Sequence, residues 1–218
     1  LIDMDPQGNA SSGLGIETDD LEFSVYDVLI NGRKISDTIH KTEVKNLVVL
    51  PSNIQLAGAE IELVSMEQRE FLLKNALEGI KDFFDYIIID CPPSLGLLTL
   101  NALVAGTSVI IPIQCEYYAL EGLSKLINTI ELVRSNLNKE LEIEGVLMTM
   151  FDGRTNLSVQ VVDEVKKYFG NKLFKAIVPR NVRISESPSY GKPVILYAPN
   201  SKGAEMYFLL GEEVLENG

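Results

Sequence analysis

Cysteine and histidine are scarce in this sequence, which limits the chemistry that the chain can carry. The 218 residues contain two cysteines, Cys91 and Cys115, and one histidine, His40. Two thiols and a distant imidazole do not complete a four-ligand zinc site, and two cysteines are too few for a disulfide framework. Each cysteine ends an apolar, strand-like run, so we expect both to be buried thiols in a reducing cytoplasm.

Neither a membrane-spanning segment nor a signal peptide is apparent. Residues 95–113 carry no charge, but Asn101, Gly106 and Pro112 interrupt them, and the stretch divides into a helix and a strand. The first residues lead into an acidic loop rather than into an apolar signal sequence. We therefore expect a cytoplasmic protein. The chain starts at Leu1, in what reads as the end of a strand, and we expect it to be the remainder of a longer chain.

Basic residues are outnumbered, but unevenly. The net charge is −12, and residues 1–115 hold 7 Lys and Arg against 17 Asp and Glu. Residues 150–203 instead hold 9 basic and 4 acidic side chains. Because the local field decides what a phosphate backbone meets, a basic face on this acidic protein is compatible with nucleic-acid binding. The same counts also fit a solvated surface of mixed charge.

Strand-like and helix-like segments alternate along most of the chain. The chain is 46% hydrophobic and 23% charged, which is typical of a soluble α/β domain, so we expect one domain over residues 1–218. Ser24 is a good N-cap for a helix over 25–30. Strands are predicted at 47–50, 86–90, 108–113, 143–150 and 173–178, and helices within 55–84 and at 97–105, about 118–137, 157–169 and 202–216. The alternation predicts a mostly parallel twisted sheet with helices on both faces.

The segment 85–96, DYIIIDCPPSLG, contains the most informative strand. Its apolar, β-branched run predicts a central strand buried on both faces, which two prolines then end. Asp90 would stand at the carboxyl end of that strand, where open α/β sheets bind ligands and where a carboxylate can hold Mg²⁺ beside phosphates. Asp90 could equally cap the following helix or a turn.

A second acidic loop lies near the start of the chain. The segment 3–15, DMDPQGNASSGLG, combines three glycines and a proline, which indicates a loop whose backbone closely approaches another group. Asp5 directly precedes Pro6, which restrains its backbone. An Asx turn is the alternative role for this aspartate.

Two further segments complete a pattern with these loops: MTMFDGRTN at 148–156 and VPRNVRISESPSYGKPV at 178–194. In this order and spacing, the four segments resemble the ParA/Soj family of chromosome- and plasmid-partitioning ATPases. That family belongs to the deviant-Walker P-loop class, which also contains MinD. The resemblance covers essentially the whole chain and implies a P-loop NTPase-like α/β fold.

The resemblance also implies roles for particular residues. Asp5 matches the residue that orients the attacking water onto the γ-phosphate of ATP. Asn9 matches a position near Mg²⁺, and Asp90 matches the Walker B aspartate that holds this metal through water. Pro179 and Asn181 lie where the family's loop cradles adenine.

The family's partners follow from the same resemblance. Arg154 and Arg183 match basic positions that relatives use to bind DNA without sequence preference, although both could be ordinary surface arginines. ATP binding makes a sandwich dimer in this family, and a ParB-type partner stimulates the hydrolysis that dissolves it. These properties imply a cytoplasmic, nucleoid-associated protein that does not bind membranes.

One element of the family pattern is not found. No GxxxxGK[ST] loop occurs in the 218 residues, and the family's P-loop would precede Leu1. We therefore expect the full-length protein to be an ATPase and this chain alone to be a poor one, since the phosphates would lack the amides and lysine that hold them.

Two other functions remain open. A MinD-like membrane-cycling ATPase would need a basic amphipathic C-terminal helix, whereas this chain ends in the acidic GEEVLENG. A non-enzymatic scaffold that keeps the fold is the other alternative. A redox role like that of the nitrogenase iron protein is disfavoured, because the two cysteines do not match its cluster ligands.

Overall fold

The computed structural model describes residues 1–116 and 119–217, and the chain forms two compact units. Unit 1 consists of Leu1–Gly106 and Asn136–Asn138. Unit 2 consists of Thr107–Ser135 and Lys139–Gly218. The single domain over residues 1–218 stays a prediction.

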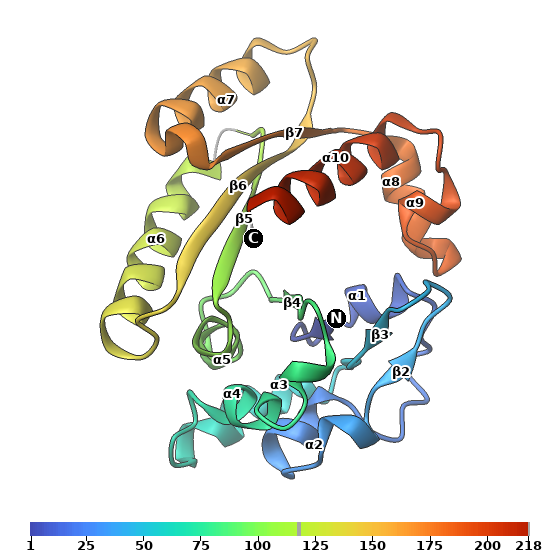
Figure 1. The fold of residues 1–218 in the computed structure, drawn as a ribbon, viewed down its shortest axis with the longest axis vertical. Helices are drawn as coiled ribbons and strands as arrows, with labels where there is room; N and C mark the ends of the chain where they lie inside the picture. Colours follow the sequence, from blue (N-terminus) through green and yellow to red (C-terminus); the bar gives the residue numbers. More distant parts are fainter. Residues whose placement is uncertain (117–118, 218) are drawn as a thin grey trace. The chain divides into compact units, whose positions relative to one another are not determined.

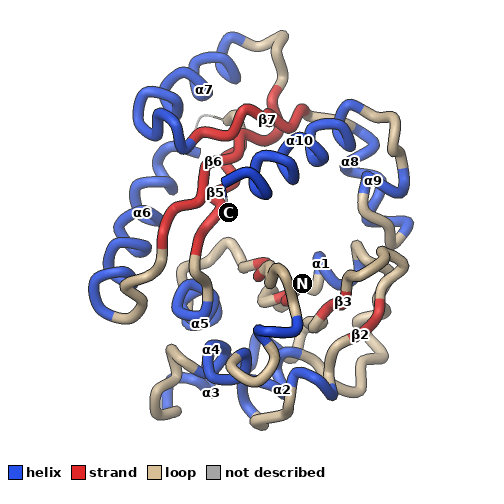
Figure 2. The backbone as a smooth tube through the Cα atoms, viewed as in Figure 1, coloured by secondary structure: helices blue, strands red, loops and turns tan. Residues whose placement is uncertain are grey.

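Two pairs of short strands lie in unit 1. The first pair is parallel and joins β1 (Ile2–Asp3) to β4 (Ile89–Asp90). The second is antiparallel and joins β2 (His40–Lys41) to β3 (Val48–Val49). An isolated parallel bridge between Ile2 and Leu50 connects β1 to the end of β3. In Figure 2 these strands are brief red segments between tan loops.

Five α-helices belong wholly to unit 1: α1 (Asn9–Ser12), α2 (Val25–Ile30), α3 (Leu56–Glu62), α4 (Leu72–Leu77) and α5 (Leu97–Ala105). Three 3₁₀ turns accompany them: η1 (Ile35–Asp37), η2 (Leu63–Ser65) and η3 (Lys81–Phe83). Helices α2 and α5 have the predicted bounds. Ser24 caps α2 in a capping box, in which the Asp27 side chain accepts from the Ser24 amide at 2.9 Å.

The prediction of a strand buried on both faces at 86–90 is wrong. Only Ile89 and Asp90 form β4, and Tyr86 and Ile88 are 55% and 64% exposed. Among the described residues, β4 pairs with β1 alone. No second strand of unit 1 therefore adjoins the other edge of β4. A run of β-branched residues reports a strand's preference for burial, but its neighbours in space decide whether that burial is complete.

Unit 2 contains a three-stranded parallel sheet in the order β5 (Ser108–Gln114), β6 (Glu142–Phe151) and β7 (Leu173–Pro179). Each strand begins within one residue of its predicted position. The side chains of β7 alternate, with Phe174, Ala176 and Val178 buried on one face. This parallel sheet and its connecting helices confirm the predicted α/β fold class.

Helices lie on both faces of this sheet (Figure 1). On one face are α6 (Ala119–Asn136), whose last residue belongs to unit 1, and α7 (Asn156–Phe169), which ends in the 3₁₀ turn η4 (Gly170–Lys172). On the other face, α10 (Lys202–Asn217) packs its partly buried residues Met206, Leu209, Leu210 and Val214 against the buried side chains of β6 and β7. Because helices cover both faces of the sheet, the core of unit 2 lies between the sheet and these helices.

The segment after β7 is more ordered than the sequence suggests. Residues 180–193 are predicted to be a polar loop, but they contain α8 (Val182–Glu186) and the 3₁₀ helix η5 (Ser187–Tyr190), and α9 (Val194–Tyr197) follows. Asn181 starts this run, because its side chain accepts from the Arg183 amide at 2.8 Å as the N-cap of α8. Such short helices carry too few residues for a periodic pattern.

Candidate nucleotide and metal site

The pairing of β1 with β4 brings the two predicted acidic loops together. In this parallel register Asp3 lies opposite Asp90. The Ile2 amide donates to the Ile88 carbonyl at 2.8 Å, and the Met4 amide donates to the Asp90 carbonyl, also at 2.8 Å. Both strands therefore end at the same edge, and the loops that carry Asp5 and Asp90 leave the strands there.

Asp3 is a residue of this site that the sequence interpretation missed. It is fully buried, and its carboxylate accepts three hydrogen bonds: from the Ser11 amide at 2.8 Å, the Ser11 hydroxyl at 2.7 Å and the Asp5 amide at 3.1 Å. These donors balance the cost of burying a charged group. Asp3 therefore fixes the loop from inside. In the sequence, the only sign of its burial was its position directly after the apolar pair Leu1–Ile2.

Gly8 allows the same loop to lie close to the backbone at Ser52, shortly after β3. Its φ of 63° lies in the left-handed region, and a Cβ there would come within 2.9 Å of the Ser52 carbonyl oxygen. The Ser52 amide also donates to the Ser11 hydroxyl at 3.1 Å. The loop's glycine therefore permits the close backbone approach that the sequence predicts, and it places Asn9 at the first position of α1.

Asp5 makes the turn that was the alternative to a catalytic role. Its Oδ1 accepts from the Gln7 amide at 3.0 Å, and its carbonyl accepts from the Gly8 amide at 2.9 Å. This Asx turn does not remove the side chain from the site, because Asp5 is only half-buried and lies close enough to Asp90 to affect its titration. The turn instead holds the carboxylate in one direction.

Electrostatic repulsion marks the place where the three carboxylates meet. Although Asp90 is exposed overall, partial burial of its carboxyl group raises its pKa to about 6, and the neighbouring charges of Asp3 and then Asp5 contribute to the shift. The part of the shift that comes from Asp3 and Asp5 shows that negative charges lie near Asp90, and a divalent cation would offset them.

The arrangement of the acidic side chains limits how a cation could be held. Among residues 1–116 and 119–217, no three His, Cys, Asp or Glu side chains are arranged to ligate a metal directly. The negative potential around Asp90 nevertheless suits a hydrated cation, because Mg²⁺ usually keeps several of its waters and takes few protein ligands. That Asp90 holds Mg²⁺ through water stays a prediction.

The two cysteines differ from one another. Cys115, at the end of β5, is buried as expected, and this burial raises its pKa to about 11. The expectation that Cys91 is also buried is wrong for the residue as a whole, which is exposed where the chain leaves β4, although desolvation of its thiol and then the charge of Asp90 raise its pKa to about 12. The incomplete cover of β4 explains the difference.

The residues predicted to hold adenine belong to unit 2, whereas Asp5, Asn9 and Asp90 belong to unit 1. Pro179 is the last residue of β7 and lies opposite Phe151 in the register with β6. Asn181 follows two residues later and uses its side-chain oxygen to cap α8. Both residues therefore stand at the carboxyl end of a parallel strand, where α/β sheets bind ligands.

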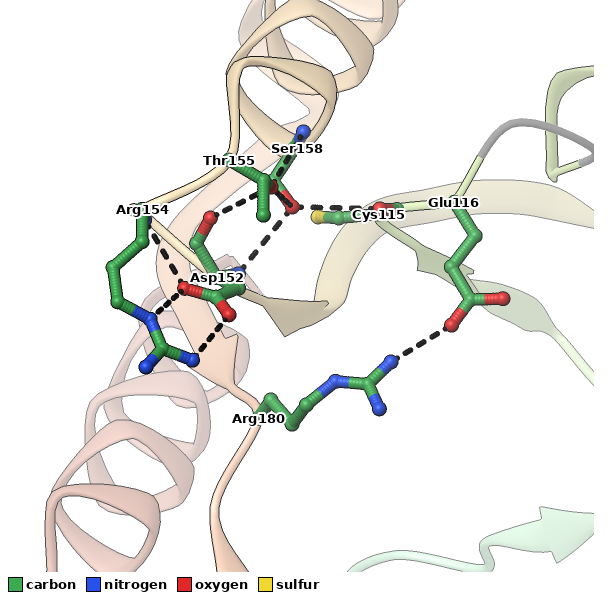
Figure 3. Close-up of polar contacts among 7 residues, drawn as sticks. All are labelled: Cys115, Glu116, Asp152, Arg154, Thr155, Ser158 and Arg180. Carbon is green, nitrogen blue, oxygen red and sulfur yellow. Dashed lines mark hydrogen bonds and ion pairs between the residues drawn. The ribbon is translucent and has the colours of Figure 1, made fainter.

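The predicted DNA-binding arginines also lie in unit 2, and both face carboxylates. Figure 3 shows Arg154 forming a two-pronged contact with Asp152, with Nε–Oδ1 at 2.9 Å and Nη2–Oδ2 at 2.7 Å. The pair holds the pKa of Asp152 at about 2. Arg183 contacts Glu186 at 3.0 Å. The side chain of Arg154 is 88% exposed, so it remains accessible to a phosphate.

Hydrogen bonds fix the loop that carries Arg154 (Figure 3). The Thr155 hydroxyl donates to the Asp152 carbonyl at 3.0 Å and accepts from the Ser158 amide at 3.3 Å as the N-cap of α7. Arg180, which follows β7, pairs with Glu116 at 2.9 Å. Arginines from two loops therefore stand at this edge of the sheet, each neutralised by a nearby acid.

Several known proteins match this chain over most or all of its length. A family model described as an AAA domain matches residues 1–143. The chain is 63% identical over 218 residues to the sporulation initiation inhibitor protein Soj of Bacillus subtilis, covering 100% of this chain and 86% of that protein. It is 57% identical over 216 residues to the chromosome partitioning protein ParA of Myxococcus xanthus, covering 99% of this chain and 76% of that protein.

Solved structures show the same fold. A cobyrinic acid a,c-diamide synthase from Mycobacterium smegmatis, crystallised with an ATP analogue and magnesium, matches with a TM-score of 0.87 and 36% identity. The match covers 99% of this chain and 81% of that chain. The parallel sheets and the acidic loops therefore define an α/β fold of the P-loop NTPase-like class. Within that class, the chain belongs to the Soj/ParA family of chromosome-partitioning ATPases.

Substitution of Asp90 by Asn should stabilise the metal-free protein at neutral pH. Because the folded state raises the pKa of Asp90 from 3.8 to about 6, the ionised carboxylate opposes folding above pH 6, and this cost fades as the pH falls to 3.8. After allowance for solvent screening, we expect Tm to rise by about 2–4 °C at pH 7.5 and by less than about half as much at pH 4.5.

Thermal unfolding in EDTA at both pH values measures this effect. Asp85→Asn is the matched control, since it removes the same charge from an exposed position before β4. An equal rise in both variants, or no dependence on pH, would show that the surroundings of Asp90 do not disfavour its ionised form.

Proposed function

We propose that this chain supplies the residues that hold Mg²⁺ and position the attacking water in an ATP-hydrolysing site. The hydrolysis at this site drives DNA segregation. One observation supports this most directly: Asp5 and Asp90 leave the same edge of paired parallel strands, close enough for their charges to interact. Phosphoryl transfer needs a positioned water, neutralised charge and a closed site more than it needs covalent chemistry. The two acidic loops supply the first two of these.

We propose for each residue the role that its match to the family implies. Asp5, held by its Asx turn, accepts a hydrogen bond from the attacking water and aims it at the γ-phosphate. Asp90 would hold Mg²⁺ through water, and the cation would offset the negative charge of the phosphates. Asn9 lies near that metal at the first turn of α1. Pro179 and Asn181 contact adenine at the end of β7.

The 218 residues contain no GxxxxGK[ST] loop, so we propose that by themselves they bind ATP weakly. Without such a loop, few backbone amides and no positioned lysine would hold the phosphates. Isothermal titration of the 218-residue chain with Mg·ATP should give a Kd weaker than about 100 μM. A Kd of a few micromolar would contradict this proposal.

The assembly that we propose is an ATP-dependent homodimer that binds nucleoid DNA without sequence preference. A ParB-type partner stimulates hydrolysis and so releases the dimer, and the protein works in the cytoplasm on the nucleoid. The relatives that carry partitioning names favour this function over a MinD-like one. No helix in the described part of the chain is long and apolar enough to cross a membrane.

Replacement of Asp5 by Asn tests the catalytic role in the full-length protein. The amide keeps the shape of the side chain but is a much weaker acceptor for the proton of the attacking water, so we expect kcat for ATP hydrolysis to fall by about 10²–10³. The Kd for Mg·ATP should change less than about threefold. Asp37→Asn, at an exposed acid in η1, is the control. A kcat within threefold of wild type would remove Asp5 from the mechanism.

Charge reversal at Arg154 or Arg183 tests the DNA surface. Each variant should weaken ATP-dependent binding to duplex DNA by about tenfold and lower the slope of log K against log salt by about 1. Fluorescence anisotropy across a salt series measures both quantities. Lys167→Glu is the matched control, because Lys167 is an exposed cation on α7 that also pairs with an acid, Glu164. Unchanged binding in both arginine variants would exclude these positions.

A further inference from the structure

The first turn of α5 is capped by a side chain from a different helix. The Leu97 amide donates to Glu60 Oε2 at 3.1 Å, and the Leu98 amide donates to Glu60 Oε1 at 3.3 Å. The N-cap residue of α5 is Gly96, which has no side chain to satisfy these amides. A carboxylate at this position also interacts favourably with the helix dipole. Helix α3, which carries Glu60, therefore completes the start of α5.

Gly96 and Glu60 form a matched pair. A Cβ atom at Gly96 would overlap the Glu60 carboxylate and lie 2.9 Å from its Cδ. The φ of Gly96 is −92°, so its backbone conformation does not require glycine. A side chain at position 96 would therefore displace the Glu60 carboxylate from the cap. The cap consequently fixes the end of the loop that begins at Asp90.

The segment that contains Glu60 is also attached to the other acidic loop. At its start, the Ser52 amide donates to the Ser11 hydroxyl, which in turn donates to Asp3. At its end, Glu60 holds the α5 terminus. A single segment, residues 52–62, thus contacts both loops of the acidic site, one at each end.

A second anchor keeps α5 in place independently of Glu60. Asn101 is fully buried; it donates to the Arg69 carbonyl at 2.8 Å and accepts from the Leu73 amide at 3.2 Å. These contacts tie the middle of α5 to α4 and to the chain just before α4. Loss of the Glu60 cap should therefore loosen the loop 91–96 and leave the helix folded.

We propose that Glu60 is a positioning residue, which sets the place of the Asp90 loop against the Asp3–Asp5 loop and thereby the affinity for the divalent cation. The metal part of this inference rests on the proposed function, whereas the cap itself does not. In this role Glu60 acts through the Leu97 and Leu98 amides and the loop before them, not by contact with the nucleotide or the metal. Groups that orient a metal-holding residue in this way typically change metal affinity by about 10- to 100-fold when they are removed.

Two measurements on the full-length protein test Glu60→Ala. Hydrogen exchange should be about 3- to 30-fold faster at the Leu97 and Leu98 amides, with unchanged protection at the end of α5. The Mg²⁺ concentration for half-maximal ATP hydrolysis should rise by about tenfold or more, with kcat at saturating Mg²⁺ within about threefold of wild type. Glu60→Gln, which keeps one acceptor, should give intermediate values of both.

Glu62→Ala is the matched control. It removes the same charge from the same helix, but Glu62 accepts from the Tyr26 hydroxyl and does not reach α5. Unchanged exchange at Leu97 and Leu98 in Glu60→Ala would overturn the cap. Faster exchange with an unchanged Mg²⁺ dependence would overturn the positioning role. A wild-type protein without Mg·ATP hydrolysis would overturn the proposed function and the metal part together, and exchange would still decide the cap.

Discussion

The structure of the acidic site depends on the parallel pairing of two short strands. Because β1 and β4 run in the same direction and Asp3 lies opposite Asp90, the loops after both strands start at one edge. The resulting repulsion between carboxylates adds to partial burial in raising the pKa of Asp90 and makes the metal-free site electrostatically unfavourable. Backbone hydrogen bonds hold the charges together, and a hydrated cation would lower the free energy of the arrangement that they impose.

Hydrogen bonds inside the loops keep these carboxylates in fixed directions. Asp3 accepts from Ser11 and from the Asp5 amide, so it organises the loop rather than facing a ligand. The carboxylate of Asp5 is oriented by the hydrogen bond that it accepts from the Gln7 amide. The charged side chains in the arginine loops of unit 2 are instead open to solvent. Arg154 pairs with Asp152 but stays exposed, so a phosphate could replace the carboxylate as its partner.

Much of the fold could be predicted from local sequence signals. Ser24 and the apolar pattern gave the bounds of α2 and α5, and the β-branched runs located all three strands of unit 2. Three features escaped because their causes are not local. The exposure of β4 depends on which strands adjoin it, the burial of Asp3 depends on Ser11, and the cap on α5 comes from Glu60, 37 positions before Leu97. The proximity of Asp5 and Asp90 was predictable because parallel strands end at a common edge.

Paramagnetic relaxation tests most directly whether both acidic loops share one metal. Mn²⁺ would replace Mg²⁺, together with ADP, in isotope-labelled full-length protein, and amide signals would be followed at low Mn²⁺ occupancy. If the carboxylates converge on one cation, signals from residues 3–9 and 89–91 broaden together, because the effect falls steeply with distance from the metal. Because β1 and β4 are directly paired, a cation at this edge lies within range of both loops, and broadening of neither would contradict the site.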